Sequence, residues 1–259
     1  MTINQNNSTF SIYEETLRVP GYECDFNQKL KSAAFFRYLT EAAGVHAEQL
    51  GAGFQALQPR NLFWVHSRMK IKFYKFPKIG ERITLHTWPK TIQQKLFFIR
   101  DYEVFNETDE KIAVASSAWL LIDSVSRRMI PSLSAGIQLP SNPDRVGLNE
   151  PLDRLGMAQN GEKRLTRTAS YSSLDLLNHV NNSRYVEWIC DAIPTEMINK
   201  NEIDWMQINY DHETRPGEEV SVFINSVASD PNLWALEGVN QSDGQRSFEA
   251  LVCWKKLRP

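Results

Sequence analysis

The sequence predicts an α+β fold in which one structural unit occurs twice. The segments that begin at Asp25 and Asp175 correspond at an offset of 150 residues, and residues 69–81 correspond to residues 206–218. In each copy a helical pattern comes first and several strand patterns follow. This order is expected of a helix packed on an antiparallel sheet.

The first copy begins with a helix. Apolar residues recur at spacings of three and four, from Phe36 and Leu39 to Ala43 and Ala47, which places them on one helical face. Gly51 follows this pattern and is expected to end the helix. Alternating apolar and polar residues then predict strands at residues 68–73, 82–88, 95–105 and 111–123.

The second copy repeats this order. Its helix is expected to start near Asn182, with Asn182 as a candidate N-cap, and to end before Pro194. A third, weaker correspondence between residues 115–119 and 250–254 falls in the last strand of each copy. The strands of this copy are predicted at residues 205–210, 219–227, 233–240 and 246–255.

Prolines separate the two copies. Pro131, Pro140, Pro143 and Pro151 are four of the chain's twelve prolines, and they delimit a linker. We therefore expect an N-terminal domain over residues 1–131, a linker over 132–151, and a C-terminal domain over 152–259.

Composition limits the classes of function. A formal net charge of -2 gives no reason to expect a nucleic-acid partner, and no apolar run is long enough to span a bilayer. The three cysteines lack paired spacing, which favours a reducing compartment such as the cytoplasm over disulfides or zinc. The histidines show no metal-ligand spacing and no cofactor-binding motif is present, so neither a metal nor a cofactor is expected.

The two copies differ in their titratable side chains. His179 in the second copy corresponds to Lys29 in the first, and Glu213 corresponds to Phe76. An imidazole and a carboxylate thus occur together in one copy and are both missing from the other. This pattern is expected when duplication leaves one working site and frees the other copy for binding.

These side chains suit the hydrolysis of an acyl bond. A histidine transfers protons near neutral pH, and a carboxylate orients it or acts as a base. Asp175 lies in the same loop as His179, and a backbone N–H between Asn178 and Asn181 is expected to polarise a carbonyl at the helix start. Structural roles remain open for all three side chains: a helix-start residue, a turn residue and a solvated carboxylate.

Two further features have both a structural and a functional interpretation. Lys70 and Lys72 alternate with apolar residues, which fits either a solvated sheet face or a docking surface for an acidic partner. The apolar face of the first helix, including Phe36 and Leu39, fits either ordinary core or one wall of an acyl tunnel.

Several motifs resemble the acyl-acyl carrier protein (acyl-ACP) thioesterases of plants and bacteria. The first is the run Asp-Leu-Leu-Asn-His-Val-Asn-Asn at residues 175–182, followed by Tyr185 and Trp188. The resemblance extends from about residue 12 to residue 254. Its other motifs are residues 22–27, residues 41–44, and residues 117–123 with the arginine pair 127–128.

The resemblance implies a tandem (double) hotdog fold, each hotdog being a helix wrapped by an antiparallel sheet. It implies an enzyme of fatty acid biosynthesis that hydrolyses fatty acyl-ACP to free fatty acid and carrier protein. The N-terminal hotdog would bind the acyl chain, near Phe36 and Leu39, and the C-terminal hotdog would be catalytic. The partner would be acyl carrier protein, small and acidic, which suits docking at Lys70 and Lys72.

The resemblance also implies catalytic roles for Asp175, His179 and Glu213. The family's asparagine two residues before the histidine is replaced by Leu177, and Asn178 is the candidate to supply that amide. A cysteine found after the glutamate in plant members is Thr214 here. An acyl-CoA thioesterase on the same fold and a non-catalytic acyl-binding protein remain alternatives, and both a monomer and a homodimer remain open.

Overall fold

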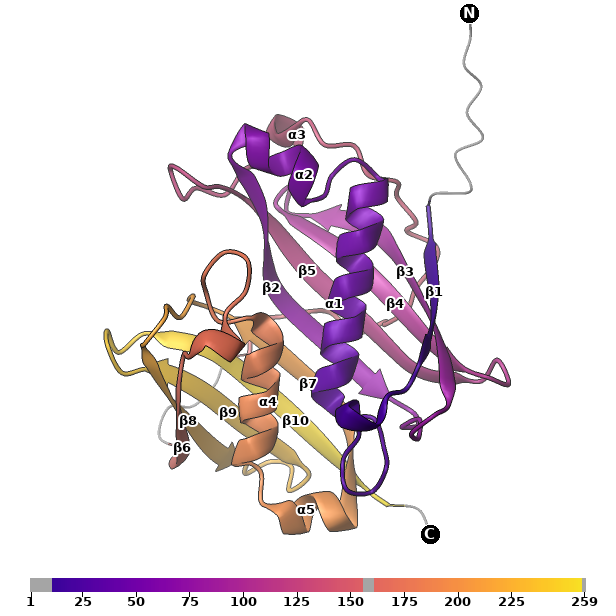
Figure 1. Cartoon of the computed structure of the whole chain (residues 1–259), viewed down its shortest axis with the longest axis vertical. Helices are drawn as coiled ribbons and strands as arrows, with labels where there is room; N and C mark the ends of the chain where they lie inside the picture. Colours follow the sequence, from indigo (N-terminus) through magenta and orange to yellow (C-terminus); the bar gives the residue numbers. More distant parts are fainter. Residues whose placement is uncertain (1–10, 156–160, 258–259) are drawn as a thin grey trace, which may run out of the picture. The chain divides into compact units, whose positions relative to one another are not determined.

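In the computed structural model, residues 11–155 and 161–257 are described. These residues cluster into two compact units (Figure 1). The first unit comprises residues 11–31, 37–66 and 75–151, and the second comprises residues 32–36, 67–74, 152–155 and 161–257. Each unit combines helix with antiparallel strands, which confirms the predicted α+β class.

The first unit is built on an antiparallel sheet with the order β1-β3-β4-β5. Residues 37–49 of the helix α1 (Ser32–Gln49) belong to this unit. Most of the residues of β4 and β5 are buried. The strands are β1 (Tyr13–Arg18), β3 (Arg82–Gln93), β4 (Phe97–Asn106) and β5 (Lys111–Asp123).

The second unit has strands in the order β7-β10-β9-β8-β6. The later part of β2 (Leu62–Phe73) pairs antiparallel with β7, from Arg68 opposite Asn209 to Lys72 opposite Trp205. The helix α4 (Asn182–Ala192) packs against β8 and β6, and the short helix α5 (Thr195–Lys200) precedes β7 (Figure 1). The strands are β6 (Glu162–Thr168), β7 (Asn201–Tyr210), β8 (Glu219–Ser226), β9 (Leu233–Asn240) and β10 (Arg246–Lys256).

Most predicted elements are present. The strands predicted at 111–123 and 233–240 have the bounds of β5 and β9, and Gly51 adopts a φ of 69° just beyond α1. The patterns did not predict β1 or β6, the first strand of each copy. Both are edge strands in which every residue is partly or fully exposed, so they carry little apolar signal.

The repeat extends to individual backbone hydrogen bonds. Gly80 and Gly217 both adopt left-handed φ values, of 86° and 82°. The N–H of Gly80 donates to the carbonyl of Val19 over 2.9 Å, and the N–H of Gly217 donates to the carbonyl of Ala169 over 2.9 Å. The correspondence seen in the sequence is therefore also a correspondence of turn geometry.

The segment expected to be a linker packs on the first unit. It begins with α3 (Ser132–Ala135), and the side chain of Asn142 donates to the carbonyl of Pro89 over 2.9 Å. Farther along, the N–H of Gly147 donates to the carboxylate of Asp101 over 2.9 Å.

Two short helical segments, α2 (Phe54–Leu57) and a turn at Gln58–Arg60, follow α1. None of the helices within residues 11–155 and 161–257 is long and apolar enough to cross a membrane.

Candidate active site

The loop before α4 is shaped by Asp175. Its Oδ1 accepts the backbone N–H of Leu177 over 2.8 Å and that of His179 over 3.2 Å. The N–H of Asp175 in turn donates to the carbonyl of His179 over 2.8 Å, which closes the loop. Asn178 lies at the tip, exposed and with a left-handed φ of 60°, a conformation that asparagine tolerates well.

The corresponding loop of the first copy has the same geometry. Oδ1 of Asp25 accepts the N–H of Asn27 over 2.8 Å and that of Lys29 over 3.0 Å, and Gln28 has a φ of 64°. The N–H of Asp25 donates to the carbonyl of Lys29 over 2.8 Å. Because the first copy lacks the histidine, the hydrogen bonds of Asp175 have a structural role that does not depend on catalysis.

His179 and Glu213 lie together in the second unit. Nε2 of His179 is 3.4 Å from Oε1 of Glu213, although the two come from loops that are far apart in the sequence. The two loops are joined by the N–H of Val180, which donates to the carbonyl of Thr214 over 2.9 Å. Both side chains are partly exposed, at 23% and 31%, so water can reach the pair.

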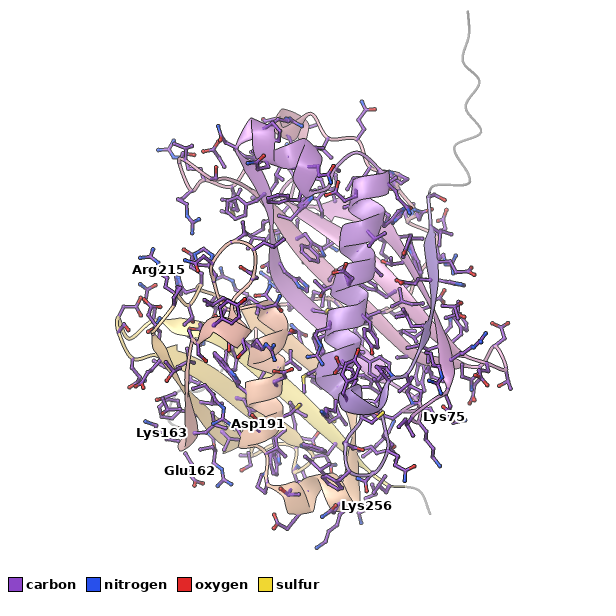
Figure 2. All side chains as sticks on the ribbon, viewed as in Figure 1. Lys75, Glu162, Lys163, Asp191, Arg215 and Lys256 are labelled. Atoms are coloured by element: carbon purple, nitrogen blue, oxygen red, sulfur yellow. The ribbon has the colours of Figure 1, made fainter. Side chains whose placement is uncertain are left out.

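Arg215 adds a positive charge beside this pair. One of its guanidinium nitrogens is 3.9 Å from Oε1 of Glu213, and the side chain is 68% exposed. It extends outward from the loop between β7 and β8 (Figure 2). A long, exposed ion pair of this kind contributes little to stability, but it increases the positive potential next to the carboxylate.

The backbone N–H groups expected to polarise a carbonyl are already occupied. The N–H of Asn178 donates to the carbonyl of Asp175, and that of Asn181 donates to the carbonyl of Ser173. Those of His179 and Val180 donate to Asp175 Oδ1 and to the carbonyl of Thr214. The prediction of an oxyanion donor between Asn178 and Asn181 is therefore wrong for this conformation.

The N-cap of α4 is Asn181, one residue before the predicted Asn182. Oδ1 of Asn181 accepts the backbone N–H of Ser183 over 3.0 Å and its hydroxyl over 2.8 Å. The first N–H groups of a helix have no acceptor within the helix, and Asn181 supplies one for Ser183. Asn182 was the expected cap, and the backbone geometry gives that role to Asn181 instead.

Other nucleophilic side chains near the site are unsuited to attack. Thr214 is fully buried, and its Oγ1 is 2.9 Å from Oγ of Ser247. Burial raises the pKa of Tyr185 to about 12. Farther along α4, desolvation raises the pKa of the Cys190 thiol to about 12. Within the part of the chain that the structure describes, no three potential ligands come together to hold a metal ion.

Lys70 does not fit the predicted docking role. Its side chain is only 9% exposed. Its Nζ lies 4.4 Å from the centre of the ring of Trp205, on the neighbouring strand β7, in a cation–π arrangement. Lys72 is partly exposed. The alternating basic strand is therefore only partly available to a partner, because Lys70 is buried and packs on the Trp205 ring.

A cavity of about 70 Å³ lies in the first unit. Phe36 and Leu39, predicted to wall an acyl tunnel, do not line it, because these large side chains are fully buried in the core. The cavity lies instead beside small residues farther along the same apolar face of α1, for which both core and an acyl-tunnel wall had remained open. Its lining includes Ala43, Gly44, Ala47, Trp64, Phe98 and Trp119.

Two family models match most of this chain. One describes the N-terminal domain of acyl-ACP thioesterases and matches residues 11–134. The other describes the C-terminal domain and matches residues 158–256. The boundary between the two matches falls in the region between the two copies.

Curated relatives are plant enzymes. The chain is 25% identical to the chloroplastic oleoyl-acyl carrier protein thioesterase of Coriandrum sativum, over 88% of this chain and 66% of the relative. It is 26% identical to the chloroplastic palmitoyl-acyl carrier protein thioesterase of Gossypium hirsutum, over 78% of this chain and 52% of the relative. The chain thus spans about half to two thirds of the length of these relatives.

Solved structures match nearly the whole chain. An acyl-ACP thioesterase from Bacteroides thetaiotaomicron is 26% identical, with a TM-score of 0.79 over 95% of this chain and 98% of the other. The 12:0-ACP thioesterase from Umbellularia californica is 20% identical, with a TM-score of 0.77 over 95% of this chain and 98% of the other. The latter likeness supports the fold alone.

These matches confirm the predicted class, a protein with the tandem hotdog fold. Both family models place the chain within one family. The chain belongs to the acyl-ACP thioesterase family.

Proposed function

We propose that this protein hydrolyses the thioester of fatty acyl-ACP, releasing a free fatty acid and the carrier protein. The observation that carries the proposal is the pairing of His179 with Glu213 at 3.4 Å, in the copy that holds both residues. Membership of the acyl-ACP thioesterase family supports the choice of substrate. The fold alone would not, because one fold hosts many activities.

In the proposed mechanism, Glu213 takes a proton from water while His179 orients that water. The hydroxide adds to the thioester carbonyl carbon and gives a tetrahedral oxyanion. The N–H of Asn182, at the first position of α4, is the proposed donor to this oxyanion, since the helix dipole also favours negative charge there. The carbon–sulfur bond then breaks, His179 passes a proton to the leaving thiolate, and Glu213 returns the proton taken from water to His179.

Asp175 is the alternative base, or the nucleophile of a route through a mixed anhydride. Its Oδ1 is already engaged by two backbone N–H groups, which favours Glu213 for proton transfer. We assign Asp175 to the positioning of His179 through the loop. Asn178, exposed at the loop tip, is proposed to contact the substrate through its amide rather than to complete the proton relay.

The domain roles form part of the proposal. The N-terminal hotdog, residues 1–131, binds the acyl chain, and the C-terminal hotdog, residues 152–259, carries out the chemistry, with residues 132–151 between them. The cavity beside Gly44 supports the first assignment, and the His179–Glu213 pair supports the second. Carrier protein docking is assigned to Lys72, with Arg215 beside the site as a second basic contact.

The central test compares the hydrolysis of acyl-ACP by the wild type with hydrolysis by His179→Ala and Glu213→Ala. Each variant should fold normally and lose at least about 10²-fold in kcat, because each removes a group that transfers or orients a proton. His212→Ala is the matched control, since His212 is an exposed histidine next to Glu213 in the sequence. Near-wild-type turnover in both site variants would reject this site.

Two comparisons separate the alternatives. Rates on one acyl group carried by coenzyme A or by carrier protein distinguish an acyl-CoA thioesterase from an acyl-ACP thioesterase. Intact acyl-ACP after long incubation with the pure protein would instead indicate a non-catalytic acyl-binding protein. The cytoplasmic location and the choice between monomer and homodimer stay predictions.

A further inference from the structure

A buried cation lies on the wall of the cavity in the first unit. Arg100, on the central strand β4, is only 6% exposed and lines this cavity together with apolar side chains. Burial lowers the pKa of Arg100 to about 10, so the guanidinium remains charged at neutral pH. A charge held this far from water requires strong partners.

No carboxylate neutralises Arg100 among the described residues. The adjacent Asp101 carboxylate is engaged elsewhere: it accepts from Nζ of Lys90 over 2.8 Å and from the N–H of Gly147 over 2.9 Å. Neighbouring residues of a strand point to opposite faces of the sheet, so Asp101 does not share the cavity with Arg100. Within residues 11–155 and 161–257, the ion pairs do not include Arg100.

Two neutral acceptors hold one end of the guanidinium. Nη1 of Arg100 donates to Nδ1 of His46 over 2.9 Å and to Oγ1 of Thr87 over 3.2 Å. Accepting through Nδ1 makes His46 the neutral tautomer with its proton on Nε2. Both side-chain hydrogen bonds of Arg100 in the described structure start from Nη1, which leaves Nε and Nη2 as donors for a ligand.

We propose that the cavity binds acyl chains that carry a keto or hydroxyl oxygen, and that Arg100 donates a hydrogen bond to that oxygen. The inference rests on the proposed function and specifies its substrate class. An unsubstituted chain offers no acceptor, so its binding would leave the remaining donors of Arg100 buried without a partner. A site built to hydrogen-bond an oxygen rejects the analogue that lacks it far more strongly than a purely apolar site distinguishes chain lengths.

The test uses pairs of acyl-ACP substrates that differ in one keto group, placed at successive carbons of the same saturated chain. The wild type should prefer the keto member of one such pair by about tenfold or more in kcat/KM, the usual effect of one hydrogen bond to a charged group. Arg100→Met, which keeps the length and removes the donors, should abolish that preference or reverse it. Equal kcat/KM for every pair in the wild type would overturn the inference.

Tyr102→Phe is the matched control. Tyr102 is fully buried two residues along the same strand, its hydroxyl lies 2.9 Å from Oγ of Ser117, and it does not line the cavity. This variant should retain the wild-type preference for the keto substrate. If Tyr102→Phe and Arg100→Met change the preference equally, Arg100 acts through packing and the proposed contact is wrong.

Binding by the wild type alone provides a second readout, in case Arg100→Met does not fold. Calorimetry would compare non-hydrolysable amide analogues of the same keto and unsubstituted acyl-pantetheines. Tighter binding of the keto analogue by about tenfold supports the inference, and equal binding refutes it. Failure to hydrolyse any acyl-ACP would reject the proposed function, whereas hydrolysis of all pairs at equal rates would reject only the role of Arg100.

Discussion

At the scale of single residues, the shape of the loop and the titratable side chains of the candidate site depend on different residues. Asp25 and Asp175 make the same backbone hydrogen bonds, but a histidine and a glutamate accompany only Asp175. The asymmetry of His179 and Glu213 was visible in the sequence because it concerns residue types. The hydrogen bonds that occupy the backbone N–H groups of the loop could not be predicted, because they depend on a turn geometry that many sequences adopt.

Replacing Asp175 tests this separation. Asp175→Asn keeps a side-chain oxygen that accepts the N–H groups of Leu177 and His179, but it removes the charge. If Asp175 only positions the loop, the asparagine variant should retain activity within about tenfold, while Asp175→Ala should lose about 10²-fold or more. Single-turnover rates with acyl-ACP provide the measurement. Equal, complete loss in both variants would show that the carboxylate itself reacts.

At the scale of elements, the described helices and strands follow the sequence patterns where burial is strong. The central strands β5 and β9 and the helices α1 and α4 were predictable, since each has a continuous apolar face or run. The position of the cavity was not predictable. It depends on side chains that are distant in the chain, such as Trp64, Phe98 and Trp119, and that meet the small residues of α1 only in the fold.

Gly44 provides a test at this scale. No atom lies within 4 Å of a Cβ added at Gly44, which is helical and lines the cavity. Gly44→Ala should therefore stabilise the protein by about 0.5–1 kcal/mol, through helix propensity alone. Thermal or chemical unfolding of the two proteins gives this difference. A destabilised Gly44→Ala would show that the space is not open.

A larger side chain at the same position should affect substrate choice. Gly44→Leu projects into the cavity and should lower kcat/KM for long acyl chains, relative to short ones, by about tenfold. Profiling the free fatty acids released by a bacterial host would show a shift to shorter chains. Gly44→Ala is the control, and an unchanged profile in Gly44→Leu would place the acyl chain elsewhere.

At the scale of the whole chain, the proline-rich segment between the copies is attached to one of them. Arg145, within this segment, donates from Nη2 to Glu103 over 2.6 Å, and the ring of Trp88 lies 4.3 Å from the guanidinium carbon. Burial would raise the pKa of Glu103, but hydrogen bonds from Lys111 and Arg145 outweigh burial and lower it. The sequence marked this segment as a linker but gave no sign of its partners, which are distant in the chain.

This lowered pKa predicts an acid-sensitive contribution to stability. The contribution is fully present above the ordinary glutamate pKa and decreases as the pH falls toward the lower pKa of folded Glu103. Glu103→Gln should thus destabilise the protein at neutral pH and progressively less at acidic pH. Urea unfolding across this range measures the difference. A pH-independent difference would show that charge at Glu103 contributes nothing.

The loop at Asp25 has one further consequence. It preserves the backbone of a site whose side chains are Lys29 and Phe76 in place of an imidazole and a carboxylate. The first copy thus has the loop geometry of the second without its two titratable side chains. The double variant Lys29→His and Phe76→Glu would place an imidazole and a carboxylate on this loop. It would show whether the loop geometry of the first copy is sufficient for hydrolysis once both side chains are present.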